Sequence, residues 1–196
     1  MALSASTLGS LIDSGFAGAG ANGKNRSKFS NALATGIVNG IVGKSFQTLD
    51  VGLVPGAGTG TGTGLTGLDA DGMKQQALAA MKSRGANSDK TMGFIMDSTV
   101  QHLAEATLTS VDTPVFAGTG TIVLGSITVT VADMTQSIVS ALKDSGANGR
   151  NVQPFANAVA TGIAFGMMTA TGTLVIAGAG SPTPSPGTGS GTGEIS

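Results

Sequence analysis

The chain has no cysteine, tryptophan or tyrosine, and its single histidine and few charged residues leave little material for catalysis. Without cysteine, disulfide bonds and cysteine-based zinc or redox sites are excluded. Charged residues are 11% of the chain, against about 25% in ordinary soluble domains, and the net charge is −1. So small a net charge produces only a weak electrostatic field, and we expect no binding to nucleic acid or to an anionic membrane. A surface this poor in charge is typical of a chain that packs against other subunits.

Glycine, by contrast, is abundant, with 32 residues, and one glycine-rich stretch imitates a phosphate-binding loop. In GAGANGKN (residues 18–25), Gly18, Gly23 and Lys24 have the spacing of G-x-x-x-x-G-K-[ST], but Asn25 replaces the hydroxyl residue. A phosphate-binding loop follows a strand and opens a helix, whereas this stretch follows an amphipathic helical pattern. Because the C-terminal end of a helix repels phosphate, we interpret the stretch as a helix-ending turn and expect no nucleotide cofactor.

The tripeptide GAN, at 20–22, 85–87 and 146–148, marks a threefold internal repeat. Apolar residues stand twelve, eight and four residues before each of these glycines, and a phenylalanine stands nine residues after each. The four-residue spacing predicts an amphipathic helix that the glycine terminates, and a further apolar stripe predicts a second helix after the turn. We expect each of these side chains in the core. They are Leu8, Ile12, Phe16 and Phe29, then Met73, Ala77, Met81 and Phe94, then Met134, Ile138, Leu142 and Phe155.

A β-rich tail with a Gly/Thr-rich arm follows each second helix. The predicted fold is therefore α+β, with three tandem helix–turn–helix–strand pseudo-repeats that carry extended Gly/Thr-rich β arms. The expected boundaries are 1–68, 69–130 and 131–196, the last with a Pro/Gly/Thr-rich C-terminal arm. Each repeat is too small to bury both helices alone, so the three are expected to pack together.

Two of the arms alternate glycine with hydroxyl residues, which in a strand places glycine on one face and hydroxyls on the other. A glycine face admits a second backbone, so we expect these arms to add to a neighbouring subunit's sheet by main-chain hydrogen bonds. The last arm would then be mobile in a free subunit and ordered in an assembly. The alternative interpretation is a flexible linker. The hydroxyl residues concerned are Thr59, Thr61, Thr63, Thr188, Ser190 and Thr192.

Pairs of glycines one helical turn apart occur at the same place in the first and third repeats. Such pairs lower helix stability, and close helix–helix approach, within the chain or between chains, is the expected reason for them. The second repeat carries Gln101 and Glu105 there, which predicts a helix that faces water or a polar neighbour. The pairs are Gly36 with Gly40 and Gly162 with Gly166.

His102 and Glu105 form an H-x-x-E pair on one predicted helix, with Asp97 about a turn earlier. A metal site or an acid–base pair needs more converging groups, so we interpret these residues as a polar helix face. We predict no enzyme, no catalytic residue, no metal and no small-molecule substrate. The uncharged stretch 159–180 has the length of a membrane span, but the repeat pattern divides it into a helix and a strand, and no span is expected.

The opening MALSASTLGSLIDSGF, the segment SKFSNALATGIVNGIV and the ending GTGSGTGEIS resemble small virion structural proteins of tailed bacteriophages. The resemblance covers mainly the first and third repeats. It implies a non-enzymatic, self-assembling particle component and assigns no functional residue.

We therefore expect a structural virion subunit that assembles through close-packed helices and strand-adding arms, in the tail, neck or baseplate first and as capsid decoration second. Its expected partners are itself and other virion structural proteins, without nucleic acid, and its expected location is the virion, assembled in the host cytoplasm. The alternative is a surface adhesin or ligand-binding module. A nucleotide-binding enzyme ranks third.

Overall fold

The order helix, helix, strand, strand occurs three times along the chain, in an α+β fold that is mainly helical. The computed structural model describes residues 3–54, 57–81, 85, 87–115, 119–168, 172–178 and 187–195. The helices are α1 (Ala5–Gly18), α2 (Arg26–Ile41), α3 (Ala70–Ala80), α4 (Ser88–Ala104), α5 (Val131–Asp144) and α6 (Val152–Met168). The strands are β1 (Ser45–Val54), β2 (Ala57–Thr66), β3 (Thr107–Val115), β4 (Thr119–Thr128), β5 (Gly172–Gly178) and β6 (Gly187–Ile195). We call α1–α2–β1–β2 unit 1, α3–α4–β3–β4 unit 2 and α5–α6–β5–β6 unit 3.

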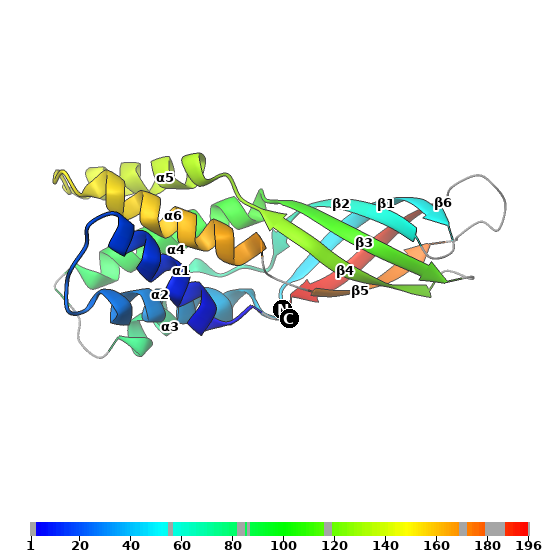
Figure 1. Ribbon diagram of the computed structural model, residues 1–196, viewed down its shortest axis with the longest axis horizontal. Helices are drawn as coiled ribbons and strands as arrows, with labels where there is room; N and C mark the ends of the chain where they lie inside the picture. The colour runs from blue at the N-terminus through cyan, green and yellow to red at the C-terminus, as the bar shows by residue number, and fades with distance from the viewer. Residues whose placement is uncertain are drawn as a thin grey trace.

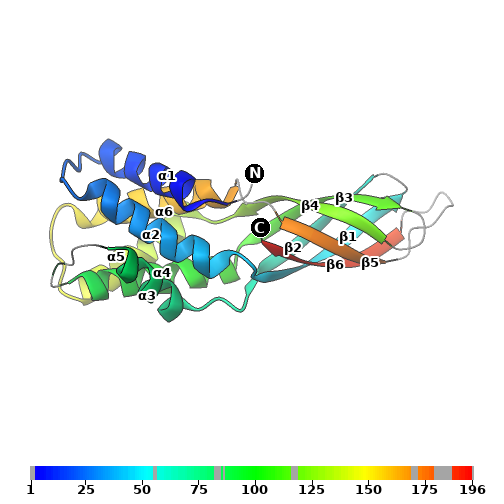
Figure 2. The same ribbon diagram turned by 90° about the horizontal axis from the view of Figure 1, so that it is seen from below.

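Helices and strands occupy opposite halves of an elongated molecule (Figure 1). The turns that join α1 to α2 and α5 to α6 lie at the outer end of the helical half, and α1 begins and β6 ends at the waist between the halves (Figure 2). Each helix packs against the next in chain order, and α6 packs against α1. The helices therefore form a closed ring.

The strands close on themselves in the same order. Each described strand pairs antiparallel with its neighbours along the chain, and β6 pairs with β1, which makes a closed barrel. The shortest ladder joins β4 to β5 through three residue pairs. The tail of each unit thus folds as a two-stranded hairpin, and closure pairs the sheet edges that a hairpin leaves open.

One apolar core extends from the helical ring into the base of the barrel. The stripe residues twelve and eight positions before the repeat glycines are all buried, as predicted. At the barrel base the buried side chains are Phe46, Leu65, Leu108, Ile127 and Ile195. Because these residues belong to all three units, no unit has a core of its own.

The three phenylalanines nine residues after the repeat glycines are less buried than predicted. Phe29, Phe94 and Phe155 are partly buried and pack against the edge of the core. Phe29 and Phe155 lie near the outer end of the ring, where their rings contact that of the buried Phe16, with centroids 6.0 Å and 5.3 Å away. A bundle end has no further layer to cover such side chains.

The GAN turn ends α1 and α5 as predicted. Gly20 has φ of +81°, and the N–H of Ala21 donates to the carbonyl of Phe16 at 2.9 Å. Gly146 repeats this arrangement after α5 with φ of +94°. These are Schellman motifs, in which glycine adopts the left-handed conformation at no steric cost. In unit 2 the helix instead ends earlier, at Ala80, and residues 82–84 and 86 lie outside the described chain.

The long uncharged stretch divides as predicted between α6 and β5. Within the described residues, no helix combines the length and the apolar character that a membrane crossing requires.

Candidate functional site

Three seams join the units, each formed by the second helix of one unit and the first helix of the next, with α6 and α1 completing the ring. In the α6–α1 seam a Cβ atom at Gly162 would lie 2.8 Å from Cα of Ile12. In the α2–α3 seam a Cβ atom at Gly36 would lie 2.5 Å from the carbonyl oxygen of Met73. No side chain fits in either place, so these two seams depend on glycine.

The other two glycines of the pairs face side chains of the partner helix and not its backbone. A side chain at Gly40 would collide with that of Met73, and one at Gly166 with that of Leu8. All four predicted glycines therefore mediate helix approach, and the partner helices belong to the same chain.

The third seam, between α4 and α5, has no such glycines. Where units 1 and 3 have Ala-x-x-x-Gly-x-x-x-Gly, unit 2 has Asp97, Gln101 and Glu105, and all three are exposed. Buried polar side chains gather on the same two helices. They are Ser98, Thr99 and His102 on α4 and Thr135 on α5.

A depression of about 470 Å³ that is open to solvent lies along the α4–α5 seam, and we call it the α4–α5 groove. Gln101 and Glu105 line its α4 wall, and Asp133 and Ser137 are among the lining residues of α5. Its barrel-side end is lined by residues before β3 and after β4. Long polar side chains thus stand where glycine closes the other seams, and the helices leave a space between them.

His102 lines this groove and is only 9% exposed. Its Nδ1 lies 2.8 Å from the carbonyl oxygen of Ser98. A carbonyl oxygen only accepts hydrogen bonds, so Nδ1 carries the proton and donates it. In the neutral ring Nε2 is then an acceptor, and no described residue is bonded to it.

The charges lining the groove are all negative: the carboxylates of Glu105 and Asp133, with no lysine or arginine among the lining residues. The groove also lies where α4 ends and α5 begins, so the opposite ends of two helix dipoles offset one another and the carboxylates set the sign. Within the described residues, no three acidic or histidine side chains are grouped so that they could hold a metal ion.

The sequence predicts His102 and Glu105 as a polar helix face and not as a site. Glu105 is exposed, as that interpretation expects, whereas His102 is nearly buried. Nothing in the sequence links Asp133, which belongs to the next unit, to these two residues. The change from paired glycines to Gln101 and Glu105 was the available signal, since it marks the seam that glycine does not close.

The Gly/Thr arms do not form the expected interaction surface. Thr59, Thr61 and Thr63 belong to β2, which pairs with β1 and β3, and Thr188, Ser190 and Thr192 belong to β6, which pairs with β5 and β1. Both arms therefore have a strand of their own chain on each side. This corrects the expectations of strand addition to a neighbour and of a flexible linker, because ring closure uses the main-chain groups that a free edge would offer.

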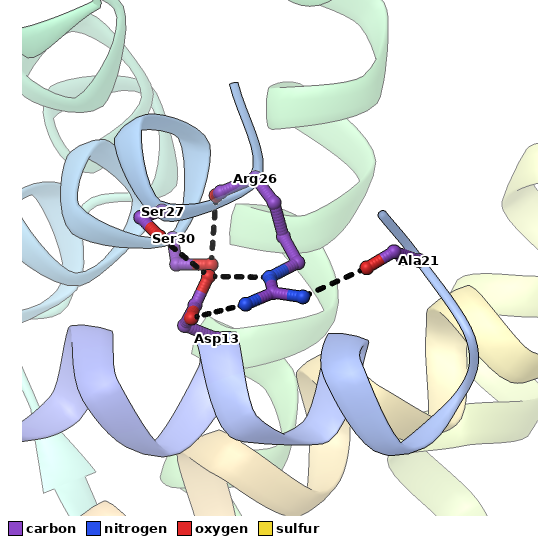
Figure 3. Close-up of polar contacts among 5 residues, drawn as sticks. All are labelled: Asp13, Ala21, Arg26, Ser27 and Ser30. Atoms are coloured by element: carbon purple, nitrogen blue, oxygen red, sulfur yellow. Dashed lines mark hydrogen bonds and ion pairs between the residues drawn. The ribbon is translucent and has the colours of Figure 1, made fainter. Parts of the chain in front are cut away.

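The stretch that imitates a phosphate loop is a structural turn (Figure 3). Arg26 donates from Nε and Nη2 to the carboxylate of Asp13, at 2.8 Å and 3.0 Å, and from Nη1 to the carbonyl of Ala21 at 2.8 Å. Ser27 donates to the same carboxylate at 3.0 Å. These bonds, that of Arg26 above all, lower the pKa of Asp13. Lys24 stays exposed, so the cation that would reach a phosphate has no site around it.

No protein-family model, no curated protein and no solved structure matches this chain.

Proposed function

We propose that the protein is a non-enzymatic structural subunit of a tailed-phage virion, in the tail, neck or baseplate first and as capsid decoration second. The resemblance of its opening, its second helix and its ending to small virion proteins motivates the assignment. Three tandem pseudo-repeats, each a helix pair followed by a hairpin, support a role in assembly.

One observation carries the structural role. Helices and strands both close into rings in chain order, and each unit contributes the same set of elements to both rings. The chain thus builds alone what three separate copies build in a homotrimer. A single chain of this kind could occupy a symmetric position in a particle, where three separate subunits would otherwise be needed.

The proposed assembly no longer uses the Gly/Thr arms, because their backbones are paired inside the barrel. Contacts with copies of itself and with other virion proteins would come from side-chain surfaces. The α4–α5 groove favours one second candidate, a ligand-binding module such as a surface adhesin.

Quantitative mass spectrometry of density-purified virus particles tests the proposal. A structural subunit is expected at a fixed ratio to the major capsid protein through successive purification steps, while contaminating host proteins decline. A chain that is abundant in the infected cell and lost from the particles would contradict a virion role and favour the second candidate.

A further inference from the structure

We propose that the α4–α5 groove binds an organic cation that carries N–H donors, a guanidinium or an ammonium group. The proposal concerns the groove alone and does not rest on a virion role.

The groove is lined mainly by groups that accept hydrogen bonds. In the neutral ring of His102, where Nδ1 donates to the carbonyl of Ser98, Nε2 is an acceptor, and an ionised Glu105 or Asp133 can only accept. The amide oxygen of Gln101 and the hydroxyl of Ser137 add further acceptors. A ligand rich in donors is complementary to such a wall, and guanidinium, with five N–H donors and no acceptor, is the richest side-chain example.

The charge of the groove also favours a cation. Two carboxylates line the groove and none of its lining residues is a cation, so a bound positive charge has no competitor inside the site. Charge-assisted bonds between N–H⁺ donors and carboxylates are shorter and stronger than neutral ones. An anion would be repelled by the same two groups.

His102 lowers the stability that the α4–α5 seam could contribute to the fold. His102 is a nearly buried polar side chain at a position where the chain could have packed as tightly as in its other seams. A polar side chain at such a position lowers folding stability relative to an apolar one, which favours a ligand role over a purely structural one.

Two sources could supply the cation: a basic side chain of a partner polypeptide or a free small amine. The probes are therefore N-acetyl-arginine amide, which mimics a side chain, and agmatine, a free compound with one cationic group at each end. N-acetyl-citrulline amide is the matched control, since it has nearly the shape of the first probe without the charge.

His102 supplies the readout, because the only histidine of the chain gives an unambiguous imidazole signal in NMR spectra of the full-length protein. Both cationic probes are expected to shift this signal saturably, and the citrulline control is expected to leave it unchanged. Agmatine binding at least tenfold tighter than the arginine probe would identify a free diamine as the source. Equal or weaker agmatine binding would identify a side chain.

Substitutions decide whether the carboxylates are responsible. Glu105→Gln and Asp133→Asn are each expected to weaken cation binding about tenfold. Asp144→Asn removes an exposed carboxylate near the far end of α5 and is expected to change nothing. Glu105→Lys should abolish binding, with unchanged circular dichroism as evidence of folding. The proposal is overturned if neither cation shifts the His102 signal, if citrulline binds equally, or if the groove variants bind as the parent does.

Discussion

The α6–α1 seam and the α4–α5 seam occupy equivalent places in the ring, yet one is closed and the other open. Along the first, Gly15 meets the backbone of Ala158 and Gly162 meets that of Ile12, so the helices touch at backbone distance over about one turn. Along the second, Gln101 and Glu105 stand at the glycine positions and a groove of about 470 Å³ opens. Two residues at fixed places in a repeat thus decide between a packed contact and a groove.

The comparison shows that the three units are similar in their elements but differ in how their helices pack against the next unit. The two closed seams bring helix backbones together at glycine, whereas the third seam holds buried polar side chains beside a groove.

The largest expected effect comes from imposing the open-seam residue on the closed seam. Gly162→Gln places a long side chain against the backbone of Ile12 and should cost about 3 kcal/mol of unfolding free energy or more. Urea denaturation followed by circular dichroism measures the change.

The reciprocal substitution is the control for this prediction. Gln101→Gly affects an exposed position and should cost only about 1 kcal/mol, the helix-propensity penalty of glycine. Equal costs for the two substitutions would mean that the seams do not differ as described.

The aromatic cluster at the outer end of the α6–α1 seam should show a graded response. Phe16 is 4% exposed, so Phe16→Ala should cost about 3 kcal/mol. Phe155→Ala and Phe29→Ala should each cost clearly less, because both rings are only partly buried. Thermal unfolding of the three variants gives the order. A Phe155→Ala variant as unstable as Phe16→Ala would indicate deeper burial of that ring.

A small stabilisation is expected from the open seam. Thr135→Val keeps the shape of the side chain and removes a buried hydroxyl without a described partner, which should raise the unfolding free energy by about 1 kcal/mol. Thr99→Val is the matched control on the facing helix, because the Thr99 hydroxyl donates to the carbonyl of Ile95 at 2.7 Å. The control should show no gain. A gain of similar size in both variants would mean that the stabilisation does not come from removing an unbonded hydroxyl.

The smallest effect concerns Asp13 in unit 1, whose equivalents Leu78 and Val139 in the other units are apolar. Arg26 lowers the pKa of Asp13 in the folded state, so the ionised carboxylate stabilises the fold at pH values above its ordinary pKa of about 4. This stabilisation is lost as the pH falls through the lowered pKa of the folded state. The urea midpoint of Asp13→Asn should therefore lie below that of the parent at pH 7, and the difference should shrink as pH falls below about 4. A constant difference across this range would contradict the linkage.

How well the sequence predicts each feature of the fold depends on how far apart in the sequence the interacting residues are. The stripe of Leu8 and Ile12 and the turn at Gly20 are local patterns, so the sequence predicts them directly. Ring closure depends on the pairing of β6 with β1 at opposite ends of the chain, which no local pattern encodes. The same limit applies to the groove. The sequence predicts a polar helix face at Glu105, but only the assembled ring shows that Glu105 and Asp133 line the same groove.

Closure of both rings in chain order makes the order of the units cyclic. Because β6 lies beside β1 and α6 beside α1, and because α1 begins and β6 ends together at the waist (Figure 2), the three units could be written in the sequence 2–3–1 with every seam kept. A circular permutant opened between Thr66 of β2 and Ala70 of α3, with a short linker from β6 to α1, would place new ends beside the glycine seam of Gly36. All the residues that line the α4–α5 groove would then lie in the first two-thirds of the polypeptide, whereas the core beneath it would still need the last unit.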